Sequence, residues 1–302
     1  MIVESHAVTD TLHAAADTLA HGADTLAAHA GGEHEGNLFT ELLHHTQDSP
    51  ELHLPFLGAI ELPHLQVFGI DVSITKHVVF MLLSAFVLIV ALTYAARQNA
   101  KRKVPTGFGN LIEIFIVFIR DEIVLPNMGK AGLKYLSYLL TTFFFILTMN
   151  LFGLIPYGAS ATGNVSVTAA LAIIAFFMIQ ISAIREQGIG HYFAHLTGGV
   201  HWALWIIMIP IEVLGLFTKP FALCIRLFAN MTGGHIVIVA LIGLIFVFKT
   251  LWVAPVSVGF VLAINFLELF VAFLQAYIFT MLTSLFMGLG MVSEHANEKH
   301  AH

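Results

Sequence analysis

The sequence predicts an all-α polytopic membrane protein with about five membrane-crossing helices, one interfacial helix and two long C-terminal helices. Of the 302 residues, 58% are hydrophobic and 11% are charged. The mean hydropathy is +0.85, which indicates a membrane protein rather than a soluble domain. The apolar residues also form runs of about 20 or more, the length that a helix needs to cross a bilayer.

Residues 1–75 form an acidic, histidine-rich region ahead of the membrane domain. Eleven of the 19 acidic residues precede Lys76, the first basic residue of the chain. We expect a solvated, pH-sensitive tail that ends in a short hairpin or interfacial segment near position 75. Several histidines could bind metal, but their irregular spacing favours the solvated tail, and we expect neither a metal site nor a cofactor; these histidines are His29, His34, His44 and His45.

The first membrane crossing is expected at residues 77–96, and the charges around it set the topology. A basic cluster follows this run at once, and by the positive-inside rule it stays cytoplasmic. The N-terminus is then outside, and the tail at 295–302 is cytoplasmic. Residues 107–125 are apolar but carry several charges, which predicts an amphipathic helix at the cytoplasmic interface; the charged residues are Glu113, Arg120, Asp121 and Glu122.

Four further apolar stretches complete the membrane domain at residues 76–294. Residues 136–155 cross outward, and residues 165–184 return. Residues 202–248 and 252–292 would measure about 70 and 60 Å as single helices, against a hydrocarbon core of about 30 Å. These two stretches are therefore strongly tilted, or they are broken at Pro210, Pro220, Gly233 and Gly234.

One arginine lies in the middle of the first long stretch. Arg226 keeps its charge under protein conditions, so within a membrane it is by default a candidate for an ion or substrate pathway. A structural tether to a carboxylate or to backbone carbonyls is the alternative. Glu212, Lys219 and Arg226 recur every seven residues and share one helix face, and Asn230 follows four residues later on the same face.

The remaining intramembrane polar residues suggest proton transfer. His235 lies nine residues after Arg226, half a turn round the helix, so it faces a different neighbour. Glu268 and Gln275 are seven apart in the last stretch and share a face. A histidine and a glutamate can exchange protons near neutral pH, and amides can order water between them. A relay that leads toward a fixed Arg226 fits a proton access path with a barrier, whereas a purely structural Glu268–His235 pair is the alternative.

At these residues the sequence resembles subunit a of the F-type rotary ATP synthase. The segments "TKPFALCIRLFANMTGGH" and "LELFVAFLQAYIFTML" carry the resemblance, which covers about residues 76–294. It implies a non-catalytic subunit with two half-channels beside a ring of c subunits, which couples proton flow to rotation and ATP synthesis. It also implies contact with the b subunits of the peripheral stalk, and a location in the bilayer of the bacterial inner membrane.

The resemblance assigns roles to individual residues. Arg226 would face the ring carboxylate and prevent protons from leaking between the half-channels. Glu212 matches an acidic position associated with the cytoplasmic exit, and Asn164 matches a family asparagine; Lys219 would have a supporting role. The outer half-channel positions are matched by Asn230, His235, Glu268 and Gln275.

The sequence departs from well-studied bacterial members at three points. His235 and Glu268 are exchanged, as in mitochondrial versions, which keeps one acid and one imidazole. Ala229 replaces a glycine, and the acidic N-terminal region is longer than usual. The long tail favours a bacterial rather than an organellar chain.

Two other functions are consistent with some of these features. A secondary transporter would use Arg226 as the counter-ion to an anionic substrate, but it predicts an internal repeat with broken helices, which the sequence lacks. A membrane assembly scaffold would use the polar groups for assembly alone. The chain carries no basic face for nucleic acid and no Walker loop for a nucleotide, and its single cysteine, Cys224, excludes an intrachain disulfide.

Overall fold

A computed structural model describes residues 51–54, 58–61, 66–67, 70–71, 75–100, 107–155, 160–190, 205–248 and 253–291. The candidate metal-binding histidines of the N-terminal region lie outside these residues. The chain divides into two compact units. Unit 1 comprises Met1–Ser49 and Gly233–Phe266, and unit 2 comprises Pro50–Thr232 and Leu267–His302.

Two short hairpins precede the membrane domain. Strand β1 (Glu51–Leu54) pairs antiparallel with β2 (Gly58–Glu61). Strand β3 (Gln66–Val67) pairs in the same way with β4 (Ile70–Asp71). The prediction of a hairpin in this segment is confirmed. The described elements that follow, from α3 onward, are all helical.

The membrane domain of unit 2 begins with helix α3 (Lys76–Ala100), the predicted first crossing. Helix α6 (Leu136–Gly153) and helix α7 (Val165–Gln187) match the next two predicted crossings, and a short 3-10 turn, η3 (Ala161–Gly163), connects them. These helices leave large apolar side chains exposed, as lipid-facing helices do. Examples are Phe86 at 64% exposed and Phe177 at 57% exposed.

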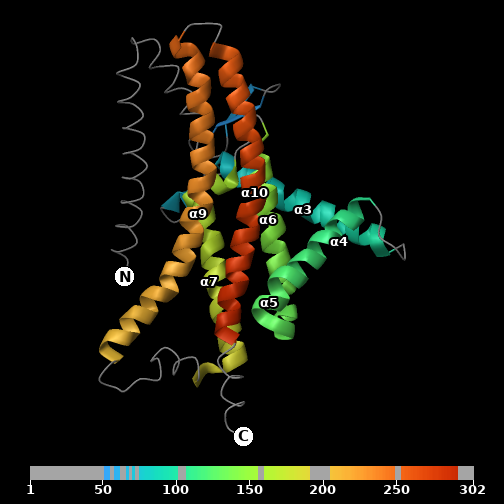
Figure 1. Ribbon diagram of the computed structural model, residues 1–302, viewed down its shortest axis with the longest axis vertical. Helices are drawn as coiled ribbons and strands as arrows, with labels where there is room; N and C mark the ends of the chain where they lie inside the picture. The colour runs from blue at the N-terminus through green and yellow to red at the C-terminus, as the bar shows by residue number, and fades with distance from the viewer. Residues whose placement is uncertain are drawn as a thin grey trace. The chain divides into compact units, whose positions relative to one another are not determined.

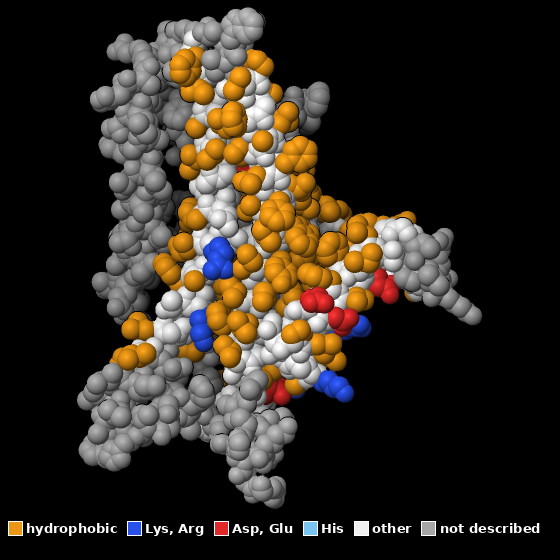
Figure 2. Space-filling view, in the orientation of Figure 1, with side chains coloured by type: hydrophobic (Ala, Val, Ile, Leu, Met, Phe, Trp, Pro, Cys, Tyr) orange, Lys and Arg blue, Asp and Glu red, His pale blue; other side chains and the backbone are white. Residues whose placement is uncertain are grey.

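The predicted amphipathic helix is present, but it is not one regular helix. Helix α4 (Phe108–Phe118) passes into a π-helix, η1 (Ile119–Val124), in which the N–H of Leu125 bonds the carbonyl of Arg120 five residues earlier. A short helix, α5 (Leu125–Met128), and a 3-10 helix, η2 (Gly129–Tyr135), lead into α6. The π-turn buries Ile119, Ile123 and Val124 completely. In Figure 2 charged side chains gather around this end of the molecule, whereas hydrophobic side chains cover much of the visible described surface.

The two long C-terminal stretches are continuous helices. Helix α9 (Trp205–Phe248) has 44 residues and helix α10 (Val253–Met291) has 39, so at 1.5 Å per residue they measure about 66 and 58 Å. Pro210 and Pro220 lie inside α9, and the helix continues through both. The alternative in which these residues break the helix is therefore wrong, because a missing N–H and a ring clash at an isolated proline can be absorbed within a long apolar helix.

Five helical stretches of the described residues are long and apolar enough to cross a membrane, which confirms the predicted fold class. They are Lys76–Ala100, Phe108–Gly153, Val165–Gln187, Leu214–Leu244 and Pro255–Met291.

Aromatic side chains hold the core of unit 2 together. Phe115 of α4, Phe143 and Phe144 of α6, and Phe273 of α10 form a cluster with ring centroids 5.4–6.0 Å apart. Such edge and tilted contacts stabilise aromatic pairs beyond the area that they bury. The cluster fixes the C-terminal half of α10 against α4 and α6, which lie beside it in Figure 1.

The C-terminal end of α10 packs closely on two other elements. The hydroxyl of Ser284 donates to the carbonyl of Ile123 in the π-helix, with an oxygen–oxygen distance of 3.3 Å. The side-chain amide of Gln187 in α7 donates to the carbonyl of Gly290. Gly288 lies so close to Asn127 of α5 that a Cβ atom would stand 2.0 Å from the Asn127 carbonyl oxygen. These contacts fix the C-terminal end of α10 against η1, α5 and α7.

An ion pair on the surface joins η2 to α7, and we expect it to contribute little. Lys134 Nζ lies 2.5 Å from Glu186 Oε1, but the two side chains are 56% and 21% exposed. Solvent screens such a pair, and holding two long side chains in one geometry costs entropy. Lys134→Gln should therefore change the melting temperature of the purified protein by less than about 3 °C. A larger drop would mean that the pair is shielded from water in the folded protein.

Candidate functional site

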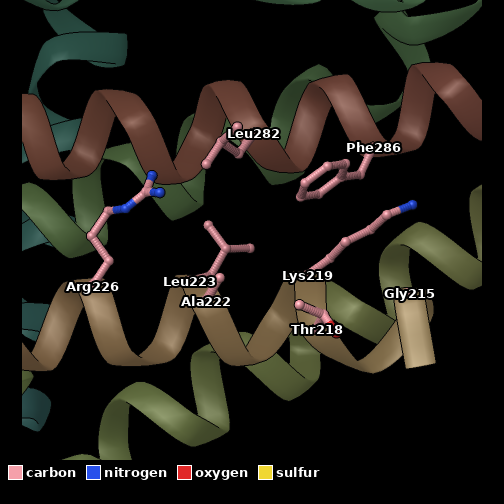
Figure 3. Close-up of a pocket in the computed structure, with 8 residues that line it drawn as sticks. All are labelled: Gly215, Thr218, Lys219, Ala222, Leu223, Arg226, Leu282 and Phe286. Carbon is pink, nitrogen blue, oxygen red and sulfur yellow. The ribbon is translucent and has the colours of Figure 1, made fainter.

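An apolar pocket with two cations at its edge lies between α9 and α10 in unit 2. Its volume is about 410 Å³, and Figure 3 shows its lining side chains. Lys219 and Arg226 come from α9, as their seven-residue spacing predicts, and Leu282 and Phe286 come from α10. The ammonium of Lys219 lies 5.0 Å from the centre of the Phe286 ring, which is cation–π distance. Gly215, Thr218, Ala222 and Leu223 complete the lining.

Arg226 has no acidic partner in the part of the chain that the structure describes. Two ion pairs among those residues are Arg120–Asp121 and Lys134–Glu186, and neither includes Arg226. The side chain is exposed at the pocket although it lies in a membrane-spanning stretch. A tether to an intramembrane carboxylate is therefore not seen among the described residues, and the guanidinium can receive an anionic group from another chain.

One helical turn after Arg226, an amide pair joins the two long helices. The side-chain N–H of Asn230 on α9 donates to Oε1 of Gln275 on α10, with a nitrogen–oxygen distance of 2.8 Å. Gln275 is 2% exposed. This bond orients both amides and places them on the same interhelical seam as Arg226. The sequence put Asn230 on the Arg226 face and Gln275 on the Glu268 face, and the structure shows that these two faces meet.

Glu268 is buried on α10, seven residues before Gln275. Its exposed fraction is 5%, and the side chain lies within the candidate span Pro255–Met291. A carboxyl group in such a place is costly unless it has specific interactions, so its burial agrees with a functional role.

The structure places the three other predicted site residues, His235, Glu212 and Asn164, in different surroundings. His235 lies on the unit 1 part of α9 and is half-buried. Glu212 is in the α9 backbone, but its side chain is outside the described residues. Asn164 is the N-cap of α7, and its side-chain oxygen accepts from the N–H of Ser166 at 2.8 Å. This is a structural role that the order Asn-Val-Ser at a helix start could have predicted.

Sequence reasoning missed a set of buried polar residues around Asn150 of α6. Asn150, Ser160 and Thr162 are at most 2% exposed. The hydroxyl of Thr162 bonds both the hydroxyl of Ser160 and the side-chain oxygen of Asn150. The available signal was an asparagine in the apolar run "FILTMNLFG", which must find partners in the interior. Among the described residues, no group of three or more His, Cys, Asp or Glu side chains could hold a metal ion.

Comparison with known proteins identifies the family. Residues 78–288 match the family described as ATP synthase A chain. The "ATP synthase subunit a" of Chloroherpeton thalassium is 51% identical over 266 residues, which cover 87% of this chain and 80% of that protein. The protein of the same name from Chlorobium phaeobacteroides is 51% identical over 276 residues, covering 90% and 82%.

A protein from a third organism gives the same result. The "ATP synthase subunit a" of Anaeromyxobacter dehalogenans is 50% identical over 293 residues, which cover 91% of this chain and 76% of that protein. These findings do not support the transporter and scaffold alternatives. Together with the five candidate spans, they establish a multi-pass membrane protein that is a component of a larger complex. The chain belongs to the ATP synthase A chain family.

Proposed function

We propose that this chain is the proton-translocating subunit a of a bacterial F-type ATP synthase. The observation that carries the proposal is Arg226, a permanent cation on an apolar interhelical pocket without a described acidic partner. In this role the chain is a non-catalytic subunit. It couples proton flow to rotation of the c ring, and so to ATP synthesis elsewhere in the complex.

Arg226 performs two tasks in this mechanism. It attracts the carboxylate of a c subunit as that subunit passes, which keeps the carboxyl group ionised while it faces the pocket. It also repels protons and other cations, so the two half-channels are not joined directly. Lys219 supports the same positive potential from one edge of the pocket, where Phe286 holds its ammonium.

The outer half-channel follows the polar residues of α9 and α10. Glu268 and His235 are the proton-carrying side chains of this path, and the bonded amides of Asn230 and Gln275 orient water on the way to the ring. The cytoplasmic half-channel opens near Glu212. Asn164 supports the outer side as the cap of α7.

The complex supplies the partners and the energy. The pocket side of α9 and α10 faces the c ring, the b subunits contact other helices, and the remaining apolar surface meets lipid. The N-terminal region lies outside the bacterial inner membrane and residues 295–302 lie in the cytoplasm. Because α9 and α10 are about twice as long as the hydrocarbon core is thick, they are strongly tilted. Each proton that crosses 100 mV releases about 2.3 kcal/mol, so several protons are needed for each ATP.

ATP-driven acidification of inverted membrane vesicles that hold the whole complex tests this function. Arg226→Ala should stop acidification, because no charge then forces the ring carboxyl to release its proton. Arg226→Lys keeps a cation and serves as the matched variant, and the content of each subunit is measured alongside. Normal acidification by fully assembled Arg226→Ala complexes would show that Arg226 is structural and that the proposal is wrong.

A further inference from the structure

A chain of buried hydrogen bonds runs through four elements of unit 2 and ends on α10. His77 Nδ1 of α3 lies 3.0 Å from the backbone oxygen of Ser160, and Ser160 Oγ lies 2.7 Å from Thr162 Oγ1. Thr162 Oγ1 donates to Asn150 Oδ1 at 2.7 Å, and Asn150 Nδ2 donates to the carbonyl of Ala272 at 3.3 Å. All five residues are at most 5% exposed.

The direction of every bond in this chain follows from the groups that form it. A backbone carbonyl can only accept, so His77 donates to Ser160 and the amide of Asn150 donates to Ala272. The one proton of Thr162 goes to Asn150 Oδ1, so the hydroxyl of Ser160 donates to Thr162. The dipoles from Ser160 to Ala272 therefore point the same way, and each bond strengthens the next.

The far end of the chain lies on the face of α10 that carries the candidate proton-path residues. Ala272 is four residues after Glu268 and three before Gln275, so the three share one helix face. Their exposed fractions are 0%, 5% and 2%. Asn150 is thus bonded to α10 between the two side chains whose positions matter for proton transfer.

The chain fits an anchor rather than a proton wire. An amide cannot pass on a proton as hydroxyls and waters do, and the chain ends on a carbonyl that has no proton to give. The approach of η3 to α6 is also tight, since a Cβ atom on Gly153 would lie 2.5 Å from Ser160 Cβ. Such a close fit leaves Ser160 little room to shift against α6.

We propose that Asn150, Thr162 and Ser160 are positioning residues, which set the rotation of α10 and so the placement of Glu268 and Gln275. This inference rests on the proposed function, because it assigns the three residues to the outer half-channel of that mechanism. His77 fixes the other end of the chain to α3. Among the described residues, the titratable groups within four positions of any member are Lys76, His77 and Glu268.

Thr162→Val tests the proposal, because it keeps the shape of the side chain and removes the donor to Asn150. The measurement is ATP-driven acidification per assembled complex in inverted vesicles, recorded as a function of pH. We expect a drop of about tenfold, because a shift of about 1 Å in a reacting group can cost a hundredfold. The pH midpoint of acidification should also move, because Glu268 then lies in different surroundings. Thr162→Ser keeps the donor and should restore both quantities.

Thr280→Val is the matched control. Thr280 is equally buried, but its hydroxyl bonds Ala276 within α10, so the substitution leaves the chain of hydrogen bonds intact. Asn150→Leu is a second variant, which has a similar side-chain size and removes both the acceptor for Thr162 and the donor to Ala272. It should reproduce the effect of Thr162→Val, and it decides the matter if Thr162→Val does not assemble.

Two results would overturn the proposal. Normal acidification per complex with an unmoved pH midpoint would mean that the chain serves only assembly. Complete loss in Thr162→Val with full activity in Asn150→Leu would mean that protons pass along the hydroxyls. Arg226→Ala is measured in the same series, and its continued pumping would defeat the proposed function whatever Thr162 does.

Discussion

In vesicles stripped of the nucleotide-hydrolysing part of the complex, Arg226→Ala is expected to let protons cross passively. The guanidinium is the charge that separates the two half-channels in the proposed mechanism, and it lies exposed at the edge of an apolar pocket. At about 5 Å and an effective dielectric constant of about 20, a unit charge raises the energy of a passing cation by about 3 kcal/mol. Removing the Arg226 charge should therefore raise the rate of passive proton passage roughly a hundredfold.

Arg226→Lys is the control for this leak, because it keeps the charge and changes only the shape of the donor group. The measurement is the decay of an imposed pH gradient, normalised to the amount of subunit in the membrane. Lysine vesicles should stay nearly as tight as the unmodified ones. Equal leak rates in the alanine and lysine variants would remove the barrier role from Arg226, even if the alanine variant fails to pump.

Gly288→Val is expected to remove most of the chain from the membrane. Any Cβ at this position meets the backbone oxygen of Asn127 at 2.0 Å and its carbonyl carbon at 2.8 Å, and a backbone group cannot rotate away as a side chain can. Overpacking in a close-fitted interior costs about 1–3 kcal/mol and sometimes more. A loss of this size lowers the ratio of folded to unfolded chain by a factor of about 5 to 30 or more, and unfolded membrane chains are removed. Quantitative immunoblots of membranes measure the outcome.

Gly259→Ala provides the comparison on the same helix. A Cβ atom there meets no described atom within 4 Å, and alanine favours a helix more than glycine does. Its membrane content should equal that of the unmodified chain. Normal amounts of Gly288→Val protein would show that α10 and α5 are not in the close contact described above.

Some elements could be predicted because their causes are local. A run of about 20 apolar residues can satisfy its backbone in lipid only as a helix, so α3, α6 and α7 could be located within a few residues of their ends. The same argument could not distinguish a continuous α9 from a broken one. The apolar run is equally long in the two cases, so its length and composition do not reveal a break. Pro220 lies inside the helix without ending it.

The candidate site divides in the same way. The seven-residue spacing of Lys219 and Arg226 on one helix determined that both reach the same pocket, because a single helix fixes its own faces. The pairing of Asn230 with Gln275 joins residues 45 positions apart, and nothing in either segment specifies the partner. The role of Asn164 as a helix cap was open to sequence reasoning, but the resemblance drew attention to a functional assignment instead.

By itself, the sequence determined that the chain crosses a membrane several times and carries one permanent charge among apolar residues. These properties depend on composition and on the period of a helix, which neighbours do not alter. Only the tertiary structure decided that Asn150 bonds the carbonyl of Ala272 and that Gly288 lies against Asn127. Those contacts depend on which faces of distant helices meet, and this is settled by close packing across the whole domain rather than by any one segment.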